Sequence, residues 1–135
     1  MTTADHPFQI FYVSQLQPES DIGVVKDIVA VSRRANPTRG ITGTLVFDGE
    51  YFGQVLEGHE ADVVALMRRI EADPRHRRLT ILFSGVTGAA RQPRVWRSGY
   101  CEAEQLDVFF DGDDSRHGPA ALAVFMTLLE DADLE

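Results

Sequence analysis

Gln54 is a polar side chain in apolar surroundings, and its amide can both donate and accept hydrogen bonds. It lies in the stretch YFGQVLEG, where side chains two apart share one face of a strand, so Phe52 and Leu56 flank it. A buried amide needs hydrogen-bond partners. A neutral group of this kind on an apolar wall suits a polar, planar ligand. The alternative is a glutamine that bonds only to backbone or water.

Tyr12 is the second candidate, in the predicted first strand, residues 8–15 (FQIFYVSQ). Both faces of this strand are largely apolar, so we expect it in the centre of a sheet. From there the phenol can reach a partner across the sheet, or its hydroxyl can simply bond to a carbonyl. If Tyr12 and Gln54 meet in one apolar groove, they indicate a ligand pocket.

Other polar candidates lie at the ends of two predicted helices. Asn36 precedes Pro37 where the first helix should end, and it serves either a ligand or only helix termination. Basic side chains gather at the end of the second helix and beyond it: Arg68, Arg69, Arg75, His76, Arg77 and Arg78. They form either a solvated helix terminus, where cations complement the helix dipole, or a basic rim for a phosphate.

Hydrophobic periodicity predicts the elements that must position these residues. We expect strands at 8–15, on both sides of the Asp48-Gly49 turn, at 79–86 and at 98–103. We expect helices at about 22–35 with Ser20 as N-cap, from Glu60 to the Asp73-Pro74 stop, and at about 119–129. This order predicts an α+β class: a ferredoxin-like βαββαβ(β) sheet with two helices on one face and a C-terminal helical cap on the other.

Composition limits the classes of function. The chain has 135 residues, a net charge of −8 and a pI near 4.9, which argues against broad binding of nucleic acid or an anionic membrane. No apolar run approaches a membrane span, and the first residues lack the features of a signal peptide. Cys101 is the only cysteine, which favours a cytoplasmic location. The histidines show no paired ligand spacing, so we expect no metal.

Together these stretches resemble the BLUF family, blue-light sensors that hold a flavin. The resemblance runs from about Phe8 to Ala103 and rests on segments in matching order: IFYVSQ, ANPTRGITG, DGEYFGQVLEG, IEADPRHRR and VW. It implies a photoreceptor that binds FAD or FMN noncovalently in a domain spanning 8–103, followed by a C-terminal helical extension, 104–135. It implies that the chain has no enzymatic activity of its own and signals to a downstream protein partner. It is also compatible with a homo-oligomer.

The resemblance also implies roles by position. Tyr12 looks like the photoactive tyrosine and Gln54 like the switching glutamine of the family. Asn36 looks like the asparagine that holds the polar edge of the isoalloxazine ring, and Ile28 and Ile70 look like the aliphatic residues on its two sides. The other cofactor-binding candidates lie near the ring, its tail or the pocket: Ser32, Arg69, Arg75, His76, Trp96 and Ser98.

The mechanism implied by the resemblance is a rearranged hydrogen-bond network. Blue light excites the flavin, Tyr12 donates an electron and then a proton, and the amide of Gln54 rotates or tautomerises. Because a buried hydrogen bond contributes about 1 kcal/mol, the rearranged network must satisfy the same groups again. The change then biases the last strand and the helix after it.

Departures from the family pattern favour an alternative, a light-independent interaction module on the same fold. Ala35 stands where relatives often carry a polar residue, and Ser98 stands where the family usually has the methionine that passes the signal into the last strand. Gly53 is smaller than the usual apolar residue, so we expect it to loosen its strand. A hydrolase resembling acylphosphatases would need an arginine-bearing loop after the first strand, where this chain has Gln15-Leu16-Gln17-Pro18.

Overall fold

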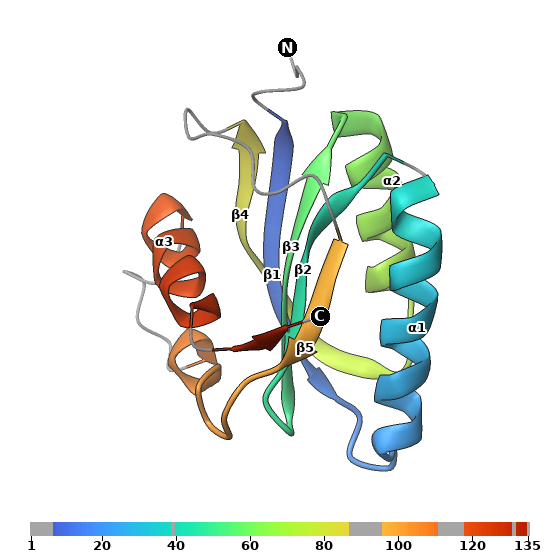
Figure 1. Cartoon of the computed structure of the whole chain (residues 1–135), viewed down its shortest axis with the longest axis vertical. Helices are drawn as coiled ribbons and strands as arrows, with labels where there is room; N and C mark the ends of the chain where they lie inside the picture. Colours follow the sequence, from blue (N-terminus) through green and yellow to red (C-terminus); the bar gives the residue numbers. More distant parts are fainter. Residues whose placement is uncertain (1–6, 39, 87–95, 111–117, 131, 135) are drawn as a thin grey trace.

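A mixed sheet with helices on both faces forms the body of the protein (Figure 1). The computed structural model describes residues 7–38, 40–86, 96–110, 118–130 and 132–134, and within these the side chains of 22, 33–38 and 133 are left out. The elements, in chain order, are β1 (Phe8–Leu16), α1 (Ile22–Thr38), β2 (Thr42–Phe47), β3 (Tyr51–Gly58), α2 (Glu60–Glu71), β4 (His76–Val86), β5 (Trp96–Tyr100), the 3-10 helix η1 (Asp107–Phe110), α3 (Gly118–Leu129) and β6 (Asp133–Leu134).

The strand order confirms the predicted ferredoxin-like class. In the described part of the chain the sheet runs β4-β1-β3-β2-β5-β6, with β1 in the interior as its apolar faces predicted. Every neighbouring pair is antiparallel except β2 and β5, which are parallel. The strands β4-β1-β3-β2 are the ferredoxin-like core, and β5 with the two-residue β6 extends it at one edge.

Each face of the sheet carries its own hydrophobic cluster. α1 and α2 cover one face, where Tyr12, Val25 and Leu66 belong to the buried cluster. α3 covers the other face, as predicted, and there Phe11 and Phe125 are fully buried. The alternation of side chains along β1 and β3 decides which residue faces which cluster. Gln54 therefore faces α1 and α2, and its neighbour Gly53 faces α3.

Several element boundaries differ from the sequence-based expectation, and β4 and β5 begin earlier, at His76 and Trp96 instead of 79 and 98. α1 continues through Pro37 to Thr38 instead of ending at about residue 35, since a proline in the last turn removes only one helical hydrogen bond. Asp21, not Ser20, caps α1, because its Oδ1 accepts the backbone N–H of Gly23 at 2.9 Å. β5 ends at Tyr100 and not at 103, because its partner strand β2 ends at Phe47 opposite it.

The Asp48-Gly49 turn forms the tight hairpin that the sequence predicts. Phe47 pairs with Phe52, and Gly49 has a φ of +104°, which favours glycine. The buried Asp48 carboxylate fastens this turn, because its Oδ1 accepts the backbone N–H groups of Glu50 and Tyr51 at 3.0 and 2.8 Å. Its Oδ2 accepts the backbone N–H of Leu106 at 3.1 Å, which ties the segment after β5 to the hairpin.

Gly53 does not loosen β3, contrary to the expectation from its size. It is buried, and a Cβ built on it would lie only 2.7 Å from Cε1 of Phe125. The ring of Phe125 therefore occupies the space that a side chain at this position would need. The missing side chain permits a close approach of α3 to the sheet rather than leaving a gap.

Gly43 is needed because β2 and β3 approach each other closely. Its φ is +143°, and a Cβ there would lie 1.9 Å from the backbone oxygen of Val55. We expect Gly43→Ala to lower the free energy of unfolding by about 3 kcal/mol or more, since backbone strain and overpacking combine. Urea unfolding measures this loss. The control is Gly40→Ala, where φ is +72° but nothing lies within 4 Å, so only a strain cost of about 1–2 kcal/mol is expected. Equal losses in the two variants would contradict the close strand contact.

Candidate functional site

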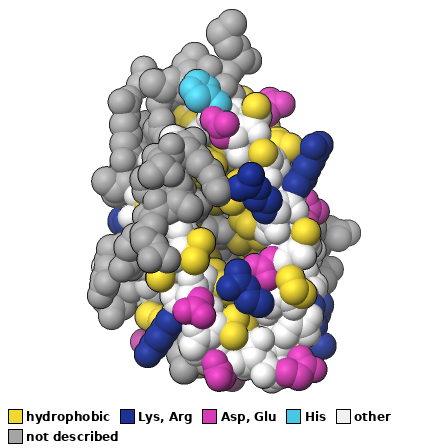
Figure 2. All heavy atoms as spheres, turned by 90° about the vertical axis from the view of Figure 1, so that its right-hand side faces the viewer, with side chains coloured by type: hydrophobic (Ala, Val, Ile, Leu, Met, Phe, Trp, Pro, Cys, Tyr) yellow, Lys and Arg dark blue, Asp and Glu magenta, His cyan; other side chains and the backbone are white. Residues whose placement is uncertain are grey.

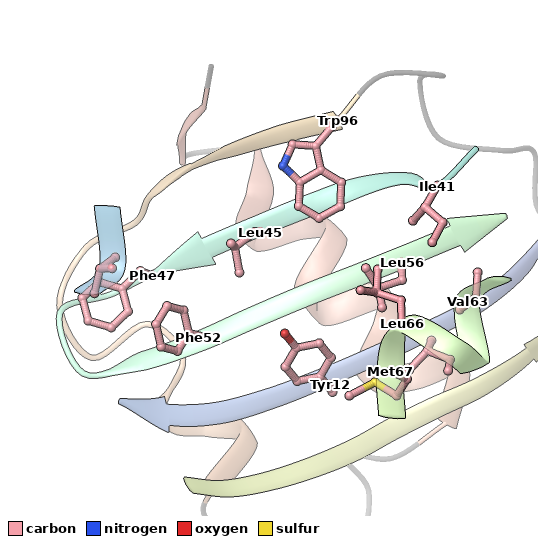
Figure 3. Close-up of a cluster of buried hydrophobic side chains, with 12 residues drawn as sticks. Tyr12, Ile41, Leu45, Phe47, Phe52, Leu56, Val63, Leu66, Met67 and Trp96 are labelled. Carbon is pink, nitrogen blue, oxygen red and sulfur yellow. The ribbon is translucent and has the colours of Figure 1, made fainter. Parts of the chain in front are cut away.

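A phenol and an amide meet on the face of the sheet beneath α1 and α2. Tyr12 on β1 lies directly opposite Gln54 on β3 in the strand register. The Tyr12 hydroxyl donates a hydrogen bond to Oε1 of Gln54, and the two residues are only 4% and 2% exposed. Figure 3 shows the hydroxyl directed toward β3, between Phe52 and Leu56. The structure thus joins the two candidates that the alternation of side chains had placed on one face.

Burial keeps the phenol of Tyr12 in its neutral, hydrogen-bond-donating form. Removal from water raises the pKa of Tyr12 well above its usual value, and the negative charge of Asp73 raises it further. Because the carbonyl end of Gln54 accepts the Tyr12 hydroxyl, the NH₂ end of the same amide can donate to a ligand. The pair therefore forms a short chain of donors and acceptors on an apolar floor.

A cavity of about 260 Å³ lies over this pair, close to the size of about 300 Å³ at which ligand pockets begin. Aliphatic side chains from both helices line it, Ile28 from α1 and Ile70 from α2. The full lining is Tyr12, Ile28, Val31, Ser32, Leu45, Phe52, Gln54, Leu66, Arg69, Ile70, Asp73, Arg75 and His76. Apolar walls with a few convergent polar groups are the composition expected of a small-molecule site.

An ion pair forms part of the cavity lining. Arg75 donates from Nη2 to Oδ2 of Asp73 at 2.6 Å and from Nε to Oδ1 at 2.9 Å. These bonds from Arg75 hold the pKa of the Asp73 carboxyl below its usual range. Arg69 lines the cavity as well. On the face that Figure 2 presents, basic side chains flank a hollow with hydrophobic atoms at its bottom.

Both ring nitrogens of His76 are held in place beside the cavity. Its Nε2 lies 2.5 Å from the carbonyl oxygen of Ile70, which can only accept, so this nitrogen carries the proton. Its Nδ1 lies within hydrogen-bond distance, 2.8 Å, of the hydroxyl of Ser14. The ring thus links β4 to β1 and to the end of α2, and it presents a fixed orientation to the cavity.

The other basic residues of the predicted cluster point away from the cavity. Arg77 donates from Nε to Oε1 of Gln15 at 3.0 Å, and the guanidinium of Arg78 lies 5.1 Å from the ring centre of Phe110. Of the cluster, Arg69, Arg75 and His76 line the cavity, and Arg68, Arg77 and Arg78 do not. Arg68 is exposed on α2, as expected of a solvated helix terminus.

The cavity brings most of the predicted binding residues together. Tyr12, Ile28, Ser32, Gln54, Arg69, Ile70, Arg75 and His76 line it. Trp96 and Ser98 are buried on β5 but do not line it. The Nε1 of Trp96 has no hydrogen-bond partner among the described residues. The side chains of Asn36 and Ala35 lie outside the described part.

Sequence reasoning missed five of the lining residues: Val31, Leu45, Phe52, Leu66 and Asp73. The sequence carried a signal for Leu45 and Phe52, because both lie on the same face of the sheet as Gln54. Phe52 is two residues before Gln54 on β3, and Leu45 lies opposite Gln54 on β2. Asp73 was interpreted only as a helix stop before Pro74, although the same short stretch supplies Arg75 and His76. Its role in the lining depends on a turn geometry that no local pattern predicts.

Within the described ranges, no group of three or more histidine, cysteine or acidic side chains is arranged to hold a metal ion. In the same ranges no helix is both long and apolar enough to cross a membrane. The donor set around the cavity, an amide, a phenol, an imidazole and guanidinium groups, suits an organic ligand with polar edges and acidic groups.

A ferredoxin-like sheet with a buried tyrosine–glutamine pair beneath a cavity between two helices defines a small-ligand-binding α+β domain. Residues 8–98 match the BLUF family, described as sensors of blue-light using FAD. The chain belongs to this family. Members are blue-light sensors that bind a flavin, and the Tyr12–Gln54 pair is consistent with the tyrosine–glutamine switch of such sensors.

Individual relatives agree with this assignment. The chain is 32% identical over 82 residues to the blue light- and temperature-regulated antirepressor BluF of Escherichia coli, a match that covers 61% of this chain and 20% of the relative. It is 33% identical over 79 residues to photoactivated adenylate cyclase subunit alpha of Euglena gracilis, covering 57% and 8%. The dark-state structure of BlrB, a BLUF protein, superposes with a TM-score of 0.71 at 25% identity, covering 94% of this chain and 97% of that one. The chain spans a fifth or less of the length of these curated relatives.

Proposed function

We propose that this chain is a blue-light photoreceptor that binds FAD noncovalently between α1 and α2 and signals to a partner protein. The observation that carries the proposal is the buried hydrogen bond from Tyr12 to Gln54 on the floor of the cavity. A polar pair of this kind in an apolar core needs a reason, since apolar side chains would pack there at less cost. A ligand that accepts a hydrogen bond from the NH₂ group of Gln54 supplies that reason.

The chemical types of the cavity residues match the parts of a flavin. Ile28 and Ile70 offer aliphatic surfaces for the two faces of a tricyclic ring, and the NH₂ end of Gln54 offers a donor for its polar edge. Arg69 and Arg75 offer positive charge for the phosphate-bearing tail. The family description supports FAD over FMN. We retain Asn36, Ser32 and His76 as ring contacts, and Trp96 and Ser98 as neighbours of the pocket on β5.

A bound flavin would supply absorption of blue light and an acceptor for one electron and one proton. Tyr12 would donate the electron and its hydroxyl proton to this acceptor, which would leave Oε1 of Gln54 without its donor. The Gln54 amide rotates or tautomerises, so that the groups it presents to Tyr12 and to the ligand exchange roles. Tyr12 would then recover its electron and proton from the acceptor, and the rearranged network would satisfy the same buried groups again, since each such bond contributes about 1 kcal/mol.

The proposed output is binding to a separate protein rather than catalysis by this chain. The relative named an antirepressor supports this proposal, whereas the one named a cyclase subunit shows that sensors of this family are also combined with catalytic outputs. We propose a cytoplasmic location, a flavin-binding domain at 8–103 and an extension at 104–135. A homo-oligomer is compatible with this arrangement, and neither nucleic acid nor membrane is part of it.

An absorption spectrum before and after blue light tests the proposal. We expect purified protein to be yellow, its absorption to shift to the red under blue light, and the shift to reverse in darkness. Chromatography of the heat-released flavin should identify FAD. At a hundredfold excess over Kd, added flavin should also stabilise the fold by about 2.7 kcal/mol. A protein that stays colourless with FAD and with FMN would support the light-independent interaction module instead.

A further inference from the structure

One aromatic ring of α3 rests directly behind the Tyr12–Gln54 pair, on the opposite face of the sheet. Phe11 precedes Tyr12 and Gly53 precedes Gln54, so alternation turns both toward α3. The ring of Phe125 stacks on that of Phe11 with centroids 4.6 Å apart, and its Cε1 lies 2.7 Å from where a Cβ on Gly53 would be. Phe125 therefore touches both strands that carry the pair.

The contact of Phe125 with the two strands is tightly packed on every side described here. Phe11 and Phe125 are 0% exposed, and the ring of Phe109 packs edge-on against Phe11 with centroids 5.2 Å apart. Leu106 fills the remaining side, since its Cδ2 lies 3.3 Å from the same Cβ position on Gly53. Protein interiors are packed as densely as organic crystals, so a displacement of one strand must be passed on to its neighbours. A shift of β3 at Gly53 must move Phe125.

A path from Gln54 through β5 is longer and ends at a small side chain. From Gln54 it crosses Leu45 on β2 and reaches Ser98 on β5, two strands away. The path through Gly53 needs only the neighbouring peptide unit of the same strand. The direct contact is therefore the stronger candidate for coupling to the helical layer.

We infer that Phe125 is the positioning residue through which the hydrogen-bond state of the Tyr12–Gln54 pair reaches α3. When the Gln54 amide exchanges donor and acceptor, β3 adjusts beside it, and the absence of a side chain at Gly53 puts the Phe125 ring in direct contact with the adjusted backbone. α3 then changes its packing on the sheet and becomes the element that a partner protein senses. This inference rests on the proposed photoreceptor function and specifies its output element.

Hydrogen exchange of the full flavin-loaded chain, in darkness and under continuous blue light, tests the inference. In the wild-type protein we expect light to change the exchange rates of α3 amides by about fivefold or more, the lower end of usual allosteric coupling. In Phe125→Leu we expect the red shift to remain, because Tyr12 and Gln54 are untouched, and the light-dependent change in α3 to be lost. A wild-type response of α3 in this variant would overturn the inference.

Phe109→Leu is the matched control. It makes the same change in the same cluster, but at a ring that packs on Phe11 and Phe125 and has no atom among the three nearest to Gly53. We expect it to keep the light-dependent change in α3. If it loses that change as fully as Phe125→Leu does, the effect is general loosening of the core and the inference fails.

Gly53→Ala provides a second test that does not depend on how well Phe125→Leu folds. Its methyl group should displace the Phe125 ring and alter α3 exchange already in darkness, and Phe125→Leu in the same chain should reverse this, because contacting residues are not additive. Purely additive effects would contradict the contact. Absence of any red shift in the wild-type protein would refute the photoreceptor itself, whereas a normal red shift with an unresponsive α3 refutes only the role of Phe125.

Discussion

Gln54→Leu is expected to abolish the blue-light-induced red shift while the protein keeps its fold and still binds flavin. Leucine has a similar size but neither accepts the Tyr12 hydroxyl nor donates to a ligand, so no rearranged network can form. The variant also leaves the buried Tyr12 hydroxyl without its acceptor, which should cost about 1–3 kcal/mol of unfolding free energy. Difference absorption spectra with and without blue light measure the response, and circular dichroism follows the fold.

Gln15→Leu is the matched control for this change. Gln15 is also a buried glutamine of the sheet, but its amide donates to Glu50 and accepts from Arg77, away from the cavity. We expect it to lose some stability and to retain the full red shift. A red shift of wild-type size in Gln54→Leu would show that the assigned switch is wrong, whatever the control does.

Tyr12→Phe should abolish the red shift by a different route. The change keeps the ring that packs in the cluster beneath α1 and α2 but leaves the buried Oε1 of Gln54 without its donor, so the loss of stability should be about 1–3 kcal/mol. Without the phenol, no hydroxyl proton is available, and the ring is a much weaker electron donor. Flavin fluorescence should therefore rise together with the loss of the red shift.

Fluorescence separates the two variants, because Gln54→Leu retains the electron donor and should stay closer to the wild-type intensity. Tyr51→Phe is the control for Tyr12, since Tyr51 stacks on Phe110 at 4.1 Å and does not line the cavity. It should leave both readouts unchanged. If Tyr12→Phe behaves like this control, the phenol has no photochemical role and the proposed mechanism fails at its first step.

Much of the fold was predictable because its signals are local. The alternation of side chains placed Phe52, Gln54 and Leu56 on one face, and the Asp48-Gly49 pair predicted the hairpin turn that the φ of Gly49 confirms. Errors fell at boundaries, where local signals compete with pairing. β5 ends at Tyr100 because β2 ends opposite it, a fact about the partner strand rather than about residues 98–103.

Residues that lie close only after folding were less predictable. The sequence indicated Trp96 and Ser98 as binding residues, yet the parallel pairing of β5 with β2 leaves both outside the cavity lining. It gave no sign that Asp73 would line the cavity and hold Arg75. The interpretation of Gly53 was wrong for the same reason, since it was judged without Phe125, which is 72 positions further along the chain.

By itself, the sequence determined the order of the elements, the α+β class and the face on which Tyr12 and Gln54 lie, because periodicity and turn chemistry act over a few residues. Only the tertiary structure decided that these two side chains bond to each other, which basic residues face the cavity, and that Phe125 lies behind the pair. These outcomes depend on strand register and on packing between layers, and both join residues that are distant in the chain.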